Sequence, residues 1–257
     1  MGKNPLKLFR YALAGWAPGG RCHCIVCGHD VWRFMPYRSG TRGAPPLMRT
    51  LAMVGSDPDR FECPRCGAHD RERHLLMYLR AAGILEDLRG KAVLHFAPEK
   101  RLSRFVAAAG PSRYIQADLF PNAPGVQRVD MLDMQFGDGS FDCVIANHVL
   151  EHVSDVPRAL AEIRRVLKHG GLAILQTPYS AKLRRTWEDE GIDDPATRLQ
   201  AHGQEDHVRL FGRDIFERIT VAGFENMVRG HSELLENVDP ARTGVNRDEP
   251  FFLFRKV

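Results

Sequence analysis

Four cysteines in two pairs are the residues of this 257-residue sequence whose spacing most directly predicts a chemical role. Residues 24–28 read CIVCG and residues 63–67 read CPRCG, so each pair has a two-residue spacer and a following glycine. The spacer lets both thiolates of a pair face one ion, and the glycine permits the tight turn that brings backbone N–H groups to the sulfurs. We therefore expect a closed, structural zinc site formed by Cys24, Cys27, Cys63 and Cys66.

One ligand of this set has an alternative, because the neighbouring Cys22 or His23 could bind the ion in place of Cys24. Five of the six cysteines lie before residue 67, and the N-terminus carries no recognisable secretory signal. Clustered thiols in such a chain favour metal binding over disulfides. The same absence predicts a cytoplasmic location.

Histidine beside carboxylates in residues 204–209 (QEDHVR) predicts acid–base chemistry. An imidazole titrates near neutral pH and suits the removal of a proton from a hydroxyl group. His207 is the candidate base, with Asp206 or Glu205 orienting its ring, and Arg209 is a candidate anchor for an anionic acceptor. The alternative is a solvated loop with no chemical role.

The elements that must position these residues alternate between short apolar runs and helical segments from residue 91 onward. This alternation predicts a doubly wound, Rossmann-like α/β sheet, whose ligands bind at the carboxyl ends of the strands. A long polar segment, 229–249, separates the last two strands and suggests an antiparallel closing hairpin. The predicted strands are 92–96, 113–118, 126–129, 141–146, 172–176, 224–228 and 250–256, and the predicted helices are 101–109, 155–168 and 214–222.

Two stretches carry a specific resemblance. Residues 138–153 (DGSFDCVIANHVLEHV) and 161–171 (AEIRRVLKHGG) are similar to the DxSFDxVxxxxVLEH…RVLKPGG stretch of the class I S-adenosylmethionine methyltransferases. The resemblance extends over residues 91–257, with His169 where the family usually has proline. It implies a methyltransferase that uses S-adenosylmethionine as its cofactor.

The resemblance also assigns roles by position. It implies that Asp118 accepts hydrogen bonds from the ribose hydroxyls of the cofactor, and that Asp133 lies beside the adenine amino group with Leu132 and Met134 near the ring. Residues 147–148 follow the fourth strand, where the methionine portion and the acceptor meet. The cofactor-binding set is then His95, Ala97, Glu99, Asp118, Leu119, Asp133, Met134 and Asn147.

The loop that follows the first predicted strand departs from the family pattern. Where the family has a glycine-rich turn, residues 95–100 read HFAPEK, and Glu99 stands where glycine would allow the closest approach to the cofactor. A buried carboxylate needs a cationic partner. We therefore expect Glu99 to bind the amino group or sulfonium of the cofactor; the alternative is a damaged pocket.

His148, Glu151 and His152 resemble the Glu-x-x-Glu-His metal triad of the quinone-pathway O-methyltransferases, with His148 at the first glutamate. Their spacing could place all three on one helix face, with His148 a further candidate catalytic residue. The alternative is that Glu151 and His152 cap and brace the helix.

The N-terminal part of the chain is basic. Residues 1–50 contain eight lysines and arginines against one acid, Asp30, whereas the whole chain has a net charge of +4. We expect a tail or short amphipathic helix at 1–20, a zinc-ribbon-like module at 21–74 and the methyltransferase domain at 75–257. The helix predicted after the second cysteine pair begins near residue 70, and we expect Arg71, Arg73 and His74 at its solvated start. The alternative is that these three residues point into a cleft shared with the next domain.

The function that follows is methyl transfer to oxygen, or nitrogen, of a small or medium-sized metabolite such as a sugar or a lipid-linked intermediate. An rRNA or tRNA methyltransferase is the first alternative, because the basic segment suits phosphate contacts. The chain has no Asn-Pro-Pro-Tyr base-binding tetrad and no aromatic-rich basic stretch, which argues against nucleic acid. The second alternative is a non-catalytic binding protein on a degenerate methyltransferase scaffold.

Overall fold

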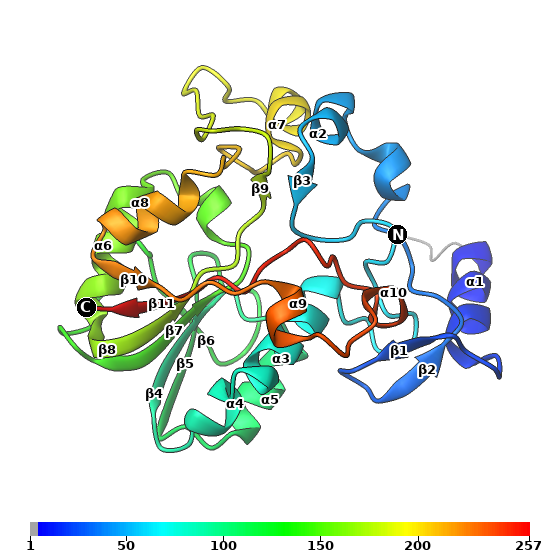
Figure 1. Ribbon diagram of the computed structural model, residues 1–257, viewed down its shortest axis with the longest axis horizontal. Helices are drawn as coiled ribbons and strands as arrows, with labels where there is room; N and C mark the ends of the chain where they lie inside the picture. The colour runs from blue at the N-terminus through cyan, green and yellow to red at the C-terminus, as the bar shows by residue number, and fades with distance from the viewer. Residues whose placement is uncertain (1–4) are drawn as a thin grey trace.

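A seven-stranded, mostly parallel sheet forms the centre of the molecule, which a computed structural model describes over residues 5–257 (Figure 1). The strand order is β10-β11-β8-β7-β4-β5-β6, and only β11 runs antiparallel to its neighbours. The predicted doubly wound sheet with an antiparallel last strand is therefore confirmed. The strands are β4 (Ala92–Phe96), β5 (Arg113–Asp118), β6 (Val126–Arg128), β7 (Phe141–Ala146), β8 (Leu167–Ile174), β10 (Phe224–Asn226) and β11 (Leu253–Lys256).

Helices cover both faces of this sheet, because its central strands are apolar on both sides. Two buried clusters result, one around Leu94, Val144 and Ile163 and the other around Leu79, Val93 and Ile145. The covering helices are α3 (Asp70–Ala81), α4 (Ile84–Asp87), α5 (Leu102–Ala108), α6 (Val156–Val166) and α8 (Ile215–Val221).

Helix α6 is an example of how the sequence determines where an element begins and which face it buries. Its buried Val156, Leu160 and Ile163 follow helical spacing, and the Asp155 side chain accepts the Arg158 N–H at the start of the helix. The helix ends at residue 166, two residues before the predicted end. Strand β8 begins at Leu167 rather than at 172, because residues 168–171 bulge between two paired segments of β7 and β8.

The N-terminal segment wraps around one end of the sheet. The helix α1 (Pro5–Trp16) packs on the hairpin of β1 (Cys22–Cys24) and β2 (His29–Val31), so residues 5–16 form the short helix that was the alternative to a tail. The 3-10 turn η1 (Gly40–Gly43) and α2 (Pro46–Thr50) follow. The short strand β3 (Met53–Val54) then pairs with β9 (Tyr179–Ser180), and α2 lies against α7 (Pro195–His202). The N-terminal segment thereby reaches across the carboxyl edge of the sheet.

The segment 229–249 is more ordered than the predicted polar loop. It contains α9 (His231–Leu234) and α10 (Pro240–Thr243), and α10 packs against β1. Figure 1 shows this segment between the sheet and the β1–β2 hairpin. No helix among residues 5–257 has the length and apolar character needed to cross a bilayer.

Arg73 joins three of these parts, so the prediction of a solvated helix start is wrong for this residue. Its side chain is fully buried and donates hydrogen bonds to backbone carbonyls from residues 60–68 and from residues 243–244. His74 is buried as well. Carbonyl oxygens from distant segments solvate the guanidinium, and no local pattern in the sequence reveals them.

Candidate functional site

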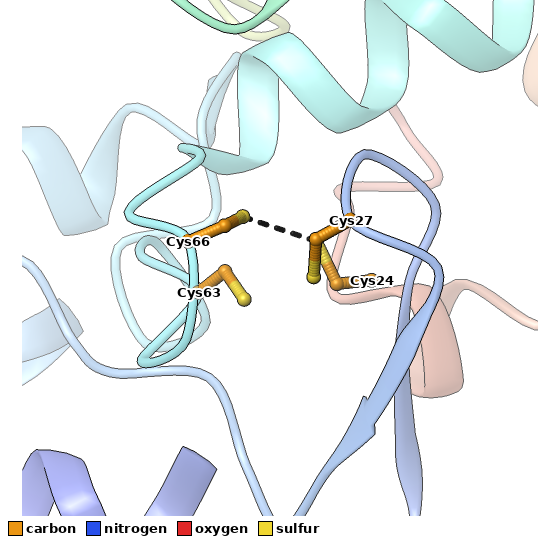
Figure 2. A group of neighbouring side chains, drawn as sticks. All are labelled: Cys24, Cys27, Cys63 and Cys66. Carbon is orange, nitrogen blue, oxygen red and sulfur yellow. Dashed lines mark hydrogen bonds between the residues drawn. The ribbon is translucent and has the colours of Figure 1, made fainter.

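The four predicted zinc ligands come together between two loops, as Figure 2 shows. Cys24 and Cys27 belong to the β1–β2 hairpin, and Cys63 and Cys66 to the loop before α3; their sulfurs all lie within 4.8 Å of one another. The two loops share one geometry. Each following glycine has a positive φ, 70° at Gly28 and 75° at Gly67, and donates its N–H to the carbonyl of the first cysteine at 2.8 Å.

The alternative ligands are directed elsewhere. The Cys22 sulfur lies 3.9 Å from the Trp32 carbonyl, and the His23 ring contacts the carboxylate of Asp30 at 2.9 Å. Four converging cysteine sulfurs suit the tetrahedral coordination of Zn²⁺. The donor set therefore fits a structural zinc ion held by the four predicted residues.

A cavity of about 410 Å³ opens at the carboxyl ends of β4 and β5. The loop 97–101, Asp118 and residues 122–126 form one side of it. The other side comes from the second cysteine loop and the start of α3, including Cys66, Gly67 and Arg71. The cysteine module thus supplies a wall of this cavity rather than standing apart from it.

Glu99 lies in the wall of this cavity and is almost completely buried. Its Oε1 accepts a hydrogen bond from Asn147 Nδ2 at 2.6 Å and lies 3.8 Å from Arg71 Nε. Its Oε2 lies 3.5 Å from His95 Nε2 but accepts no hydrogen bond from the described residues. Burial acts to raise the pKa of Glu99, but contact with His95 and the nearby positive charge outweigh it and hold the pKa below its ordinary value.

The backbone at Ala97 takes the conformation that a glycine-rich turn would provide. Its φ is +45°, and its N–H donates to the Ala117 carbonyl at 2.8 Å, which ties the loop to the end of β5. A non-glycine residue in the left-handed region costs conformational energy of order 1 kcal/mol, and alanine has the smallest side chain to place there. The fold therefore forms the turn without the usual glycines.

The remaining implied cofactor residues lie in three different settings. Asp118 lines the cavity, with its Oδ1 accepting the Phe120 N–H at 2.8 Å, and Leu119 beside it is exposed. Asp133 is also exposed but does not line this cavity, and Met134 is buried in the hydrophobic core. His95 is buried at the end of β4, where its Nδ1 contacts the Tyr114 hydroxyl at 2.8 Å.

His148 lies between two buried carboxylates beyond the end of β7. Its Nδ1 is 3.4 Å from Glu151 Oε1, and its Nε2 is 3.4 Å from Glu249 Oε1. Burial acts to lower the pKa of His148, but the two carboxylates outweigh it and raise the pKa to about 9. The backbone is held at φ +56°, with the His148 N–H bound to the Gln176 carbonyl at 2.8 Å. Both ring nitrogens therefore face acids.

His207 has a different environment from the predicted one. Its Nδ1 contacts the His202 carbonyl at 3.2 Å, whereas Asp206 lies beside His152 and Glu205 pairs with Arg38. Burial lowers the pKa of His207. The structure groups His207 with Glu151 and His152, which lie in the 3-10 turn η2 (Leu150–His152) rather than on a longer helix face.

Arg209 does not serve as an open anion anchor. Its guanidinium is buried and donates to the backbone carbonyls of residues 150, 153 and 154, and it pairs with Glu188. These acceptors occupy the guanidinium, so Arg209 connects the segment after α7 to the turn that carries Glu151.

Two buried glutamates of this region were not predicted from the sequence. Glu249 contacts His74, His148 and Gln176, so it joins α3 to the ends of β7 and β8. Glu72 accepts the His69 N–H with Oε2 and the N–H groups of residues 101 and 102 with Oε1. The sequence contained a local pattern only for Glu72, whose position three residues into a helix is typical of a residue that caps the helix start.

Known proteins share parts of this sequence. A family described as "Methyltransferase domain" matches residues 91–175. The phthiotriol/phenolphthiotriol dimycocerosates methyltransferase of Mycobacterium leprae is 31% identical over 196 residues, which cover 68% of each chain. A 2-phytyl-1,4-naphtoquinone methyltransferase of Synechococcus elongatus is 40% identical over 62 residues, which cover 23% of this chain and 27% of that enzyme.

Two further proteins are similar to this chain. An uncharacterized 37.1 kDa transposon protein of Streptomyces fradiae is 35% identical over 101 residues, which cover 38% of this chain. The chain thus spans little more than a quarter of the length of that protein, 28%, and of the Synechococcus enzyme. The solved structure of the 1,6-didemethyltoxoflavin-N1-methyltransferase of Burkholderia thailandensis has 16% identity and a TM-score of 0.46, covering 70% of this chain and 78% of that one.

Proposed function

We propose that this chain, which belongs to the class I S-adenosylmethionine-dependent methyltransferases, methylates an oxygen, or a nitrogen, of a small or medium-sized metabolite. A sugar or a lipid-linked intermediate is the proposed acceptor class. The relatives support this choice, since one is named for phthiotriol dimycocerosates and another for a phytyl naphtoquinone. Bound S-adenosylmethionine supplies a methyl group on a positively charged sulfur.

The observation that carries the proposal is the buried carboxylate of Glu99 in the wall of the cavity. Its Oε2 has no hydrogen-bond donor among residues 5–257, and its partner Asn147 follows the neighbouring strand β7. A carboxylate oxygen that accepts no hydrogen bond from these residues suits the cationic amino group of the cofactor, and Asp118 at the end of β5 suits the ribose hydroxyls. The residues present therefore fit the cofactor, with Ala97 giving the backbone turn.

The acceptor is proposed to bind next to Asn147, at the edge where β7 and β8 end. His148, Glu151 and His207 gather there, and Thr177 at the end of β8 donates its hydroxyl to Glu151 Oε2 at 2.9 Å. We propose that this cluster holds the acceptor oxygen in line with the methyl group and promotes loss of its proton. Asp206 acts indirectly in this proposal, by contacting His152.

A structural zinc ion on Cys24, Cys27, Cys63 and Cys66 completes the proposal. Because Cys66 and Gly67 line the cofactor cavity, the ion would hold one wall of the binding site in place. Metal analysis of the purified protein is expected to give about one zinc ion per chain that is lost when the cysteines are replaced, as a single four-cysteine site requires.

The test of the function is to supply S-adenosylmethionine with a radioactive methyl group to the purified protein, together with fractionated cell extract. We expect the label in the metabolite or lipid fraction. Label recovered only in RNA would replace the proposal with the nucleic-acid alternative. Failure of the protein to bind S-adenosylhomocysteine in calorimetry at about 100 μM would favour the non-catalytic scaffold, since cofactors of this kind bind with Kd values near micromolar.

A further inference from the structure

Glu151, His152 and His207 form a second group of metal-ligating side chains, separate from the cysteines. One ligand atom from each lies within 4.8 Å of the other two. The first two belong to the turn after β7, and His207 comes from the segment after α7, more than 50 residues later in the chain. The Val208 N–H donates to the Glu151 carbonyl at 3.0 Å and joins the two segments.

Backbone carbonyls contact the Nδ1 atom of both histidine rings. His152 Nδ1 lies 3.2 Å from the Asp206 carbonyl, and His207 Nδ1 lies 3.2 Å from the His202 carbonyl. A ring whose Nδ1–H donates to a carbonyl keeps the Nε2 lone pair for another partner. This arrangement is typical of metal-binding histidines, whose other nitrogen is held by a carbonyl or carboxylate.

Two polar atoms of the group are buried with no hydrogen-bond partner. They are Glu151 Oε1 and His207 Nε2, as counted among residues 5–257. Most buried polar atoms in folded proteins are paired, and an unpaired one calls for an explanation such as an ion or a water molecule. The second carboxylate oxygen of Glu151 is already fixed by Thr177. Glu151 Oε1 lies 3.4 Å from His148 Nδ1 without forming a hydrogen bond, so the pocket presents an imidazole nitrogen and a carboxylate oxygen that can each take a further partner.

We propose that Glu151, His152 and His207 bind a divalent transition-metal cation. Two imidazoles and one carboxylate suit Mn²⁺, Fe²⁺, Co²⁺ or Zn²⁺ better than Ca²⁺ or Mg²⁺, which take oxygen ligands. The surrounding charge is compatible with a cation, because Glu249 and Glu151 flank the single imidazole of His148. Three protein ligands leave coordination positions free, and His152 is the exposed member of the group, with its side chain 34% exposed.

The role of this metal site rests on the proposed methyltransferase function, which it would make more specific. The turn that carries Glu151 follows Asn147, which contacts Glu99 in the wall of the cofactor cavity. An acceptor hydroxyl that bound the ion at a free position would lose its proton more readily and would lie close to the cofactor. The predicted triad of His148, Glu151 and His152 is replaced in this arrangement, because His148 is held between Glu151 and Glu249 instead.

The test is to titrate zinc-loaded protein with CoCl₂ and record the visible absorption of Co²⁺. We expect one weakly absorbing Co²⁺ per chain, without the intense near-ultraviolet bands that cysteine coordination would give. His207→Gln is expected to weaken Co²⁺ binding at least tenfold, which corresponds to about 1.4 kcal/mol. The matched control is His169→Gln, which changes an exposed histidine of β8 and is expected to bind Co²⁺ like the wild type.

Two outcomes would overturn the site: no Co²⁺ bound by the wild type beyond the cysteine site, or equal binding by wild type and His207→Gln. If His207→Gln does not fold, His152→Gln replaces it, since His152 is partly exposed. Calorimetry with S-adenosylhomocysteine on the same samples reports the cofactor cavity independently. Intact cofactor binding without Co²⁺ binding would refute the metal site and leave the proposed methyltransferase function standing.

Discussion

Two neighbouring parts of the sheet edge are built in different ways. The cofactor edge, formed by Glu99 and Asp118 at the ends of β4 and β5, depends on residues close to them in the sequence, on Asn147 and on the cysteine module. The acceptor edge, formed by His148, Glu151, His207 and Glu249, combines segments from the whole second half of the chain.

The comparison shows how one fold can separate two tasks. At the cofactor edge the buried carboxylate of Glu99 has a lowered pKa and lines a cavity, as binding of a cationic ligand requires. At the acceptor edge acids and histidines hold one another, so that lone pairs are positioned for an acceptor. Variants at the first edge should change cofactor affinity, and variants at the second should change turnover.

The largest effect is expected from loss of the proposed zinc ion. Cys66→Ser should reduce the zinc content, lower the melting temperature and weaken S-adenosylhomocysteine binding, because Cys66 lines the cavity. Binding of structural zinc contributes on the order of 10 kcal/mol to folding in small domains. Cys22→Ser is the matched control, since Cys22 lies outside the sulfur cluster. A folded, zinc-free variant with wild-type cofactor affinity would contradict the shared wall.

The next largest effect is expected at the acceptor edge. His207→Gln should lower kcat about 100-fold, within the range for loss of a group that assists proton transfer. Its affinity for S-adenosylhomocysteine should not change, because His207 does not line the cofactor cavity. Steady-state kinetics and calorimetry measure the two quantities, with His169→Gln as control. A joint loss of kcat and cofactor affinity would show that the two edges are not separate.

Glu99→Gln should lower cofactor affinity, in contrast to His207→Gln, which should lower kcat. Removal of the charge should weaken S-adenosylmethionine binding by about 10- to 100-fold, since a charged hydrogen bond contributes about 1.5–3 kcal/mol. Glu86→Gln, at an exposed position of α4, is the control. Calorimetry at constant zinc content provides the measurement, and unchanged affinity would refute the role of Glu99.

A smaller effect is expected for Glu72→Gln. Glu72 connects the end of the second cysteine loop to the start of α5, so the variant should loosen the loop that carries Glu99. Loss of one such hydrogen bond costs about 1 kcal/mol, and cofactor affinity should fall about fivefold. Zinc content should stay constant. Reduced zinc binding with unchanged cofactor affinity would mean that Glu72 serves only the module.

The smallest effects concern the pH dependence of stability. The lowered pKa of Glu99 contributes stability that is present above the ordinary glutamate pKa and is lost as the pH falls through the lowered value. Burial raises the pKa of Asp70 from 3.8 to about 7, so its contribution has the opposite sign and stability decreases as the pH rises through that interval.

Urea unfolding of wild type, Glu99→Gln and Asp70→Asn at several pH values tests both signs. Glu99→Gln should be less stable than wild type near neutral pH, and the difference should shrink in acid. The free energy of unfolding of Asp70→Asn should increase relative to that of the wild type as the pH rises from about 4 to 7. Parallel pH profiles for all three proteins would show that neither carboxylate has the environment described here.

The sequence predicted those features that depend on local patterns. Strand–helix alternation placed β4, β5 and β7 correctly, and the duplicated cysteine spacing predicted the sulfur cluster. The start of β8 was predicted five residues too late, since a bulge sets it and periodicity does not reveal bulges. Asp133 was expected beside the cofactor, and it lies outside the residues that line the cavity.

Contacts between distant segments limited the prediction of the acceptor edge. Arg73 looked like a solvated residue at a helix start, but carbonyls from residues 243–244 make its burial possible. Likewise, His148 and Glu249 are about 100 residues apart in the sequence, and only the folded chain brings them together. Burial of a charge depends on partners of this kind, which the spacing of nearby residues does not specify.

The most direct test of the account is a crystal structure of the zinc-loaded protein with S-adenosylhomocysteine. We predict that the ligand occupies the cavity between β4 and β5, with its amino group at Glu99, its ribose at Asp118 and the Cys66 loop as the opposite wall. A nucleoside bound elsewhere, with Glu99 and Asp118 turned away from it, would contradict the account.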